Sequence, residues 1–312
     1  DRSKVVNLLK RGAKLATGED RFADFESMGM KPEYTTEAAI ERASVVIDCT
    51  PSGAGLENRK MHYDAANHVK GFLAQGSEFG FGKMYARGIN DEALVAGEDR
   101  FIHVVSCNTH NLSALVKCFA LEDGGTDNLE SADFVCIRRA NDVSQAGSFC
   151  PSPEVGKHGD AEFGTHHARD ASHLFQTLGY DLRNLYSSAC KVNSQYMHTV
   201  RFHIRVKNPT STEQLLERVA ADDKLALTFK RSANQIFSFG RDHGFFGRIL
   251  NQTVIPQEAL TVRDGHDIYG FCFTPQDGNS LLSSVAGALW LNDPKSYDER
   301  LQCLSPYFYD EV

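Results

Sequence analysis

The sequence lacks several features that would place it in a simple class of protein. It has no apolar run near the roughly 20 residues that a membrane-crossing helix needs. Its first residues lack the basic, apolar and small-residue regions of a secretory signal. None of its eight cysteines forms a CxxC pair, so a zinc ribbon and a thioredoxin-type motif fit poorly. A net charge of −8 argues against general nucleic-acid binding, but it leaves room for a local basic pocket that holds a small anion.

What remains is the composition of a globular protein, with 312 residues of which 41% are hydrophobic and 24% charged. A chain of this length typically folds into two domains. The dispersed cysteines are better explained as free thiols of a cytosolic enzyme than as a secreted disulfide framework. We therefore expect a cytoplasmic protein with no nucleic-acid, membrane or metal partner.

The first part of the chain alternates short apolar strands with helices. We expect strands at 43–49, 69–76 and 101–106, and helices at 36–42, 56–67 and 112–121. This alternation predicts an α/β sheet with mostly parallel strands.

Beyond about residue 125 the pattern changes to longer strands with few helices. We expect strands at 131–140, 196–208 and 225–232, glycine-rich punctuation at 237–247, and an apolar helix at 280–292 that packs back on the first sheet. Along 196–208 the even-numbered positions from His198 to Val206 share one face, and polar residues share the other. Thr210 and Glu213 have capping-box spacing before a helix. The second part is predicted to be an α+β domain with a mostly antiparallel sheet.

Cys107 lies where a predicted strand ends and a helix begins, in VVSCNTHNL (104–112). Amides at a helix N-terminus stabilise a thiolate, lower its pKa and can hold a developing oxyanion. This suits an aldehyde dehydrogenase that forms a thiohemiacetal and then a thioester. The alternative is a small buried residue at a turn, which is common for a lone cysteine.

The segment SCNT (106–109) resembles the active-site segment SCNTTGL of the archaeal (class II) glyceraldehyde-3-phosphate dehydrogenases. Further segments resemble motifs of that family in the same order. They are DCTPSGAGLEN (48–58) for D-x-x-P-x-x-x-G-x-x-N, AQGSE (74–78) for QGGE, IRRAND (137–142) for RRAxD, THHARD (165–170) for SHHGPD, YMH (196–198) for LMH and FGRDHG (239–244) for YGRDxG. The resemblance extends from about residue 5 to residue 292.

The resemblance implies a role for each matching residue. Cys107 is then the nucleophile, Asn108 belongs to its turn, and His198 is the general base. The substrate phosphate is expected to contact Thr109, Arg138, Arg139, His166 and His167. Because neighbouring strand residues face opposite ways, one of the two arginines is expected to reach it. Without the resemblance, His198 would be a core histidine, the arginines a solvated strand end and the two histidines a helix start.

A nicotinamide cofactor, NAD or NADP, also follows from the resemblance. The expected cofactor-binding residues are Pro51, Gly53, Gly55, Gln75, Gly76 and Ser284. Most of them follow the carboxyl ends of parallel strands, where open α/β sheets bind nucleotides. Residues 1–106 and 280–312 would form a Rossmann-type cofactor domain, N-terminally incomplete, and residues 107–279 a catalytic and oligomerisation domain.

The chain departs from the family pattern in four places. His110–Asn111 replace Thr-Gly, Ala168–Arg169 replace Gly-Pro, and Ser283–Ser284 replace a Glu-Asn pair whose asparagine orients the nicotinamide amide. The glycine fingerprint GxGxxG of the first strand and helix is not found. We therefore expect the 312 residues alone to bind NAD(P) poorly and to be inactive.

The expected function is the phosphorylating oxidation of glyceraldehyde 3-phosphate in glycolysis or gluconeogenesis. Its partners would be a small phosphorylated aldehyde and inorganic phosphate, and the protein would be a homotetramer. Two alternatives stay open: a related semialdehyde or acyl-phosphate reductase, and a non-catalytic relative that acts in binding or assembly.

Overall fold

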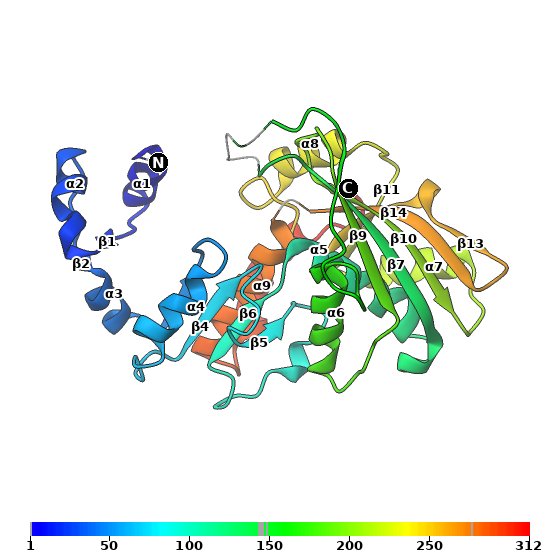
Figure 1. Cartoon of the computed structure of the whole chain (residues 1–312), viewed down its shortest axis with the longest axis horizontal. Helices are drawn as coiled ribbons and strands as arrows, with labels where there is room; N and C mark the ends of the chain where they lie inside the picture. The colour runs from blue at the N-terminus through cyan, green and yellow to red at the C-terminus, as the bar shows by residue number, and fades with distance from the viewer. Residues whose placement is uncertain (1, 143–146, 148, 276) are drawn as a thin grey trace.

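The computed structural model describes residues 2–142, 147, 149–275 and 277–312, and in it two main sheets lie side by side (Figure 1). A smaller parallel sheet occupies the middle of the molecule, and a larger mixed sheet lies beyond it. No helix in the described part of the chain is long and apolar enough to cross a membrane.

The first sheet is parallel throughout, with the strand order β3-β4-β6-β5. Its strands are β3 (Val45–Asp48), β4 (Gly71–Gln75), β5 (Lys83–Tyr85) and β6 (Phe101–Val104). The helical elements between them are α4 (Ala54–Asn58), η2 (Arg59–Tyr63) and η3 (Asp91–Ala93). The predicted α/β sheet is confirmed. The helix expected over 56–67 ends at Tyr63, and β5, which the sequence did not reveal, has only three residues.

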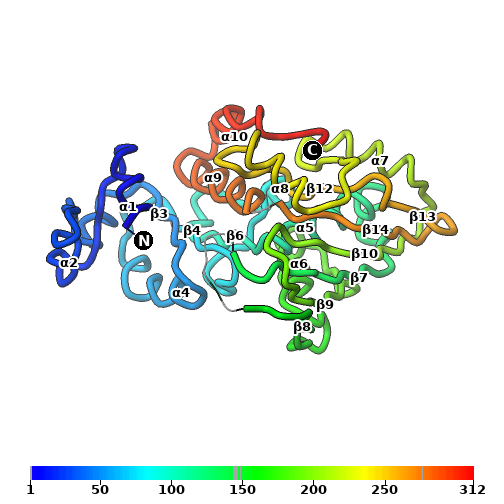
Figure 2. Tube along the Cα trace, turned by 90° about the horizontal axis from the view of Figure 1, so that it is seen from above, coloured from blue at the N-terminus to red at the C-terminus, as the bar shows by residue number. Residues whose placement is uncertain are grey.

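An N-terminal arm precedes this sheet and lies at one end of the molecule (Figures 1 and 2), where the guanidinium of Arg11 lies 5.2 Å from the centre of the Phe246 ring. It consists of α1 (Arg2–Lys10), β1 (Ala16–Thr17), η1 (Glu19–Arg21), α2 (Phe22–Ser27), β2 (Tyr34–Thr35) and α3 (Thr36–Arg42). The strand expected at 43–49 is observed as β3, and it is preceded by a short parallel pair, β1 and β2, that the sequence did not reveal. Neither α1 nor α2 contains a buried residue, and β3 is an edge strand of its sheet.

The second sheet has the order β11-β12-β14-β10-β7-β9-β8, with β13 paired to β14. The strands are β7 (Leu129–Arg138), β8 (Glu154–Val155), β9 (Leu185–Lys191), β10 (His198–Val206), β11 (Leu225–Thr228), β12 (Thr253–Pro256), β13 (Thr261–Arg263) and β14 (Asp267–Thr274). Apart from the parallel pairs β7–β9 and β11–β12, the neighbours run antiparallel. The mostly antiparallel second sheet is therefore confirmed.

The alternation predicted for β10 is also observed. Val200, Phe202, Ile204 and Val206 are at most 1% exposed, whereas the residues between them reach the surface. The ring of Phe202 lies over Gly270, its partner on β14, where an added Cβ would come 2.4 Å from the ring. The strand thus buries one face in the core and leaves the other open.

Helices of the second part are α5 (Cys107–Val116), η4 (Lys117–Leu121), η5 (Gly125–Asn128), α6 (His166–Gln176), α7 (Thr212–Ala221), α8 (Ala233–His243) and η6 (Gln257–Ala259). Two expectations need correction. The capping box of α7 is formed by Ser211 and Gln214, one residue after the predicted pair. The glycine-rich stretch is largely helical. Within α8, Gly240 allows the helix to lie close to Ile249, whose side chain would lie 3.3 Å from a Cβ added at Gly240.

Near the C-terminus, α9 (Gly278–Asn292) packs on β3, β4 and β6, as predicted. Leu282, Ala286 and Trp290 share a core with Leu73 and Ile102 of the parallel sheet. The helices α10 (Tyr297–Leu301) and η7 (Gln302–Tyr307) follow. The chain then returns to the second sheet, where Glu311 forms a parallel bridge with Leu227 of β11.

Candidate active site

Cys107 is the first residue of α5, and two residues separate it from the end of β6. The side chain of Ser106 caps this helix by accepting a hydrogen bond from Thr109 N at 3.3 Å. Asn279 of α9 donates its Nδ2 to the carbonyl oxygen of Cys107 at 3.0 Å. The predicted strand-to-helix position is confirmed, and α9 holds the backbone of Cys107 in place.

The protonation state of Cys107 differs from the sequence-based expectation of a lowered pKa. The residue is partly exposed, yet burial of the thiol raises its pKa to about 11, and the charge of Asp277 adds to the rise. Arg139, the amide of Asn108 and Arg138 act in the opposite direction. Desolvation of a thiolate therefore outweighs the amide and the two cations in this state of the protein.

A chain of buried polar groups fixes the residues that follow Cys107. Asn111 donates to Thr274 Oγ1 at 2.7 Å, and Thr274 donates to Asn108 Oδ1 at 3.1 Å. Thr274 is in turn the ladder partner of His198. Asn108 and His198, both expected at the catalytic site, are thus linked through Thr274 at the end of β14.

His198 is neutral and has a defined tautomer. Burial, followed by the charges of Arg139 and Arg138, lowers its pKa to about 3. Its Nδ1 accepts the backbone N–H of Arg139 at 3.1 Å, so the ring proton lies on Nε2. In this tautomer the free edge of His198 donates a hydrogen bond. A role as general base requires the bond to Nδ1 to open first.

A basic cavity of about 350 Å³ lies beside this site. It is lined by Arg138, Gly156, Lys157, Gly159, Asp160, Thr165, His166, His167, Arg169 and Ala189. The side chains of Arg138 and Lys157 make no hydrogen bond or ion pair to another described residue, whereas Arg169 pairs with Asp170 at 2.7 Å. Two cations are therefore available to an anion in this cavity.

His167 connects the cavity to the residue that precedes Cys107. Its Nδ1 lies 3.5 Å from Ser106 Oγ, directly before Cys107. Its Nε2 is buried and has no partner in the described part of the chain. Burial lowers the pKa of His167 well below its ordinary value, and the nearby His166 adds to this effect. An anionic ligand would supply the missing partner to a ring nitrogen that is costly to leave unpaired.

The other residues expected at the phosphate have different neighbours. Arg139 is 6% exposed and pairs with Asp142 at 2.6 Å and with Asp277 at 3.4 Å, so both of its partners are already carboxylates. Thr109 is fully buried, and its hydroxyl lies 2.9 Å from Ser106 Oγ. Neither residue lines the basic cavity.

A second cavity of about 710 Å³ lies at the carboxyl ends of β3 and β4, against the first turns of α9. Of the residues expected at the cofactor, Gln75 and Ser284 line it, and Ser284 Oγ lies 3.0 Å from Gln75 Oε1. Arg11 and Arg248 line it as well and give its wall a positive charge. This is the position at which open parallel sheets bind nucleotides.

The glycine loop after β3 is occupied by a protein carboxylate. Glu78, 1% exposed, accepts hydrogen bonds from Gly53 N at 2.5 Å and from Leu56 N at 3.1 Å. A Cβ on Gly55 would come 3.1 Å from that carboxylate. Pro51, Gly53, Gly55 and Gly76 do not line the second cavity, and His103 Nε2 binds the carbonyl oxygen of Gly76 at 2.6 Å.

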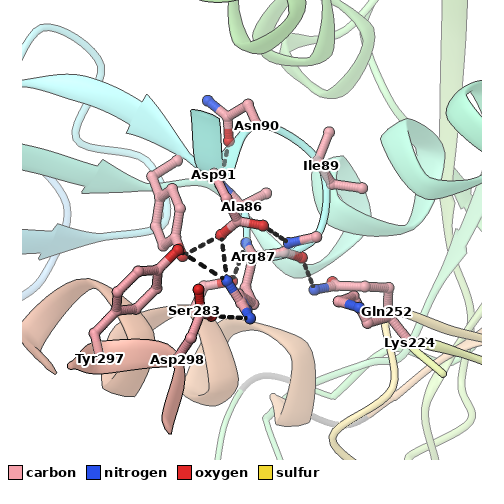
Figure 3. A network of polar contacts seen from close by, with 12 residues as sticks. Ala86, Arg87, Ile89, Asn90, Asp91, Lys224, Gln252, Ser283, Tyr297 and Asp298 are labelled. Carbon is pink, nitrogen blue, oxygen red and sulfur yellow. Dashed lines mark hydrogen bonds and ion pairs between the residues drawn. The ribbon is translucent and has the colours of Figure 1, made fainter. Parts of the chain in front are cut away.

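Two of the four departures from the family pattern contact each other. His110 Nε2 lies 2.8 Å from Ser283 Oγ, and both residues are fully buried. Ser283 Oγ also accepts the N–H of Arg87 at 2.9 Å (Figure 3). The serine proton therefore points to His110, whose Nδ1–H donates to the carbonyl oxygen of Ser106 at 2.9 Å. The substituted positions form one closed chain of hydrogen bonds between α5 and α9.

Arg87 extends this chain to the end of the molecule. Its guanidinium pairs with Asp298 at 2.6 Å and with Asp91 at 3.1 Å, and Gln252 donates to its carbonyl oxygen at 2.6 Å (Figure 3). Both sheets and α10 are thereby tied to the start of α9.

Sequence reasoning missed several of these residues. Lys157 comes from a glycine-containing segment without regular structure, and nothing in PEVGKHG signals a ligand. Asp277 and Asn279 act on Cys107 across about 170 positions, so no local pattern could indicate them. In the described part of the chain, no group of three or more His, Cys, Asp or Glu side chains could hold a metal ion.

The fold and the site define a class of protein: a Rossmann-type parallel sheet joined to an α+β part, with a cysteine at a helix start between two cavities. No family model matches the chain. The glyceraldehyde-3-phosphate dehydrogenase of Haloarcula marismortui is 26% identical over 302 residues, which cover 93% of this chain and 78% of that protein. Glyceraldehyde-3-phosphate dehydrogenase 1 of Methanosarcina barkeri is 26% identical over 268 residues (84% and 73%), and the enzyme of Metallosphaera sedula is 24% identical over 273 residues (83% and 73%). The chain is thus similar, at 24–26% identity, to glyceraldehyde-3-phosphate dehydrogenases of archaea, the family that its motifs resemble.

Proposed function

We propose that the chain oxidises a small phosphorylated aldehyde, glyceraldehyde 3-phosphate, with NAD or NADP and inorganic phosphate, in the cytoplasmic reactions of glycolysis or gluconeogenesis. One observation carries the proposal. Arg138, His166 and His167 line a single basic cavity, and His167 contacts the residue directly before Cys107. A phosphate held there places the rest of a short substrate near the thiol.

The chemistry assigned to Cys107 begins with attack of its sulfur on the aldehyde carbon, which gives a thiohemiacetal. The oxidised nicotinamide of NAD(P) supplies the hydride acceptor when bound. The resulting thioester on Cys107 is released by attack of a phosphate oxygen, which gives an acyl phosphate and returns the thiol. His198, with its proton on Nε2, would donate a hydrogen bond to the oxygen of the thiohemiacetal.

The thiol must lose its proton before it attacks, and the raised pKa of Cys107 makes this the demanding step. Arg138 and Arg139 favour the thiolate, while Asp277 opposes it. His198 takes up the proton only after Arg139 N releases Nδ1. A small movement of the Arg139 backbone would therefore free Nδ1 of His198. It would convert His198 from a hydrogen-bond donor into the general base that the resemblance implies.

The second cavity fits a nicotinamide cofactor. It lies at the carboxyl ends of parallel strands, it carries two arginines, and the buried Nε2 of Gln75 has no partner among the described residues. Gln75 and Ser284 would hold the ring. The amides of Gly53 and Leu56 already bind Glu78. The remaining expected residues would therefore shape the loops beside the cavity without contacting the cofactor; they are Pro51, Gly53, Gly55 and Gly76.

The proposal assigns residues 1–106 and 280–312 to the cofactor domain and 107–279 to the catalytic and oligomerisation domain of a homotetramer. The last residues pair with β11 and so belong structurally to the second sheet. A related semialdehyde or acyl-phosphate reductase is the second candidate, favoured by Lys157, whose side chain has no partner among the described residues, and by the replaced Thr-Gly pair. A non-catalytic relative is the third.

The test is NAD(P) reduction with glyceraldehyde 3-phosphate, with and without phosphate, by the full-length protein and its Cys107→Ser variant, because the 312 residues alone are expected to be inactive. Phosphate-dependent reduction that Cys107→Ser abolishes supports the proposal. Arg138→Met should raise KM at least tenfold, and Arg231→Met, which removes an exposed arginine remote from the cavity, should not. Reduction with another aldehyde alone would favour the second candidate. An unreactive Cys107 would favour the third.

A further inference from the structure

We propose that Gln75, positioned by Ser284, binds the carboxamide of the nicotinamide ring and thereby replaces the asparagine that the chain lacks at position 284. This inference rests on the proposed function. It concerns the last residue of β4 and a serine on the second turn of α9, which face each other across one cavity.

The polar atoms of Gln75 are only half satisfied. Ser284 Oγ lies 3.0 Å from Oε1, whereas the buried Nε2 has no partner in the described part of the chain. Leaving such a buried group unpaired is unfavourable, so native proteins keep few of them. A ligand in the cavity can remove this cost.

The contacts of Ser284 explain why an amide is the matching ligand group. Its single hydroxyl proton faces two oxygens, Ser280 O at 2.6 Å and Gln75 Oε1 at 3.0 Å. The shorter bond within the helix takes the proton. Ser284 Oγ can then only accept, so it holds the Gln75 amide when this turns to donate Nε2 to Ser284, which leaves Oε1 for a ligand. A carboxamide offers both a donor and an acceptor, so it pairs with either atom of Gln75.

The position in the fold selects the nicotinamide end of the cofactor. Asp277 lines this cavity, and its charge raises the pKa of the Cys107 thiol, so cavity and nucleophile are electrostatic neighbours. Asn279, on the same turn of α9, donates to Cys107 O at 3.0 Å. A ring whose amide lies on Gln75 and Ser284 is therefore placed at the end of the cavity nearest the thiol.

The experiment measures binding of nicotinamide mononucleotide, and of its analogue without the carboxamide, to the full chain by calorimetry. The mononucleotide probes this end of the site without the adenosine half. We expect the wild-type chain to prefer the amide-bearing ligand by roughly ten- to hundredfold, the range of one buried hydrogen-bond partner. Gln75→Met should abolish this preference. Ser284→Ala should reduce it, because it frees the side chain of Gln75.

The matched control is Gln176→Met, the same substitution at an exposed position at the end of α6, which should keep the full preference. Circular dichroism verifies that each variant is folded. An unchanged preference in Gln75→Met overturns the inference and leaves the proposed function standing. Failure of the wild-type chain to bind either ligand contradicts both the inference and the cofactor part of the proposed function.

Discussion

At the scale of single residues, the charge state of Cys107 is set by groups that lie far away in the sequence. A helix N-terminus alone predicts a lowered thiol pKa and the most readily alkylated of the eight cysteines. Burial and Asp277 instead raise this pKa to about 11. In the ligand-free chain at neutral pH we now expect the exposed Cys303 to be alkylated before Cys107.

Asp277→Asn should move the alkylation profile of Cys107 to lower pH. The carboxylate disfavours the thiolate, so its removal lowers the thiol pKa and raises the labelled fraction at a given pH. The measurement is the rate of iodoacetamide labelling of the Cys107 peptide from neutral pH to about 11. Asp142→Asn, which removes the other partner of Arg139, is the control and should move the midpoint less. An upward shift in Asp277→Asn would show that the electrostatic account is wrong.

His198→Ala should lower turnover far more than His203→Ala. The first histidine is buried beside the end of β14, while the second lies on the open face of β10 and pairs with Asp267 at 2.7 Å. Loss of a group that transfers or stabilises a proton typically costs about 10²–10⁴ in rate. Steady-state rates of both variants decide the matter, and equal losses would remove His198 from the proposed chemistry.

Sequence motifs identified several residues whose contacts only the structure explains. Asp48 and Asn58 frame the DCTPSGAGLEN segment because Asn58 Nδ2 donates to Asp48 Oδ2 at 2.9 Å. Glu78 closes the AQGSE segment because its carboxylate binds the loop amides. Both matched the family pattern, yet their roles are structural. Contacts of this kind form between segments that the fold brings together, so a local sequence pattern does not predict them.

At the scale of elements, hydrophobic periodicity was a reliable guide where one face is buried. The alternation of β10 and the apolar length of α9 were correctly predicted. The strand β14 was not predicted, because Gly270 and Cys272 interrupt its pattern where it accommodates Phe202 and the polar chain at Asn111. Packing against a partner decides such strands, and the partner is distant in sequence.

The contact between α5 and α9 should show energetic coupling between two substituted positions. His110→Thr and Ser283→Ala each break the same hydrogen bond, so the double variant should cost less than the sum of the single variants, by about 1 kcal/mol. Urea unfolding of the four proteins measures this. Ser172→Ala, which removes a buried hydroxyl without a partner in the described part of the chain, is the control and should cost little. Additive effects would contradict the coupling.

At the scale of the whole molecule, the open face of the second sheet is the surface that a partner subunit would cover. It carries Arg201, His203 and Arg205 on β10 and the 43% exposed Phe271 on β14. His203 stacks on Tyr269 with ring centroids 4.4 Å apart, so the face is ordered as well as open. The sequence predicted that β10 has one buried and one open face. The periodicity of a single strand does not indicate which surface of a partner subunit would cover the open face.

We expect the chain to form a homotetramer through such surfaces. Multi-angle light scattering at micromolar concentration should give four times the mass of one chain, and Phe271→Lys should shift the distribution to smaller species if this face is used. A monomer at that concentration would contradict the expected assembly. An unchanged tetramer in Phe271→Lys would move the interface elsewhere.

The central claim is that Cys107 is a nucleophile served by the basic cavity, and its most direct test does not depend on the cofactor. In the reverse half-reaction, the thiol attacks the acyl phosphate of 3-phosphoglycerate, inorganic phosphate leaves, and a thioester remains on the enzyme. Peptide mass spectrometry after brief incubation should locate the acyl group on Cys107, at least tenfold less in Arg138→Met and not at all in Cys107→Ser. Acylation that is absent, or that occurs equally on Cys303 and Cys49 and ignores Arg138, would contradict the account.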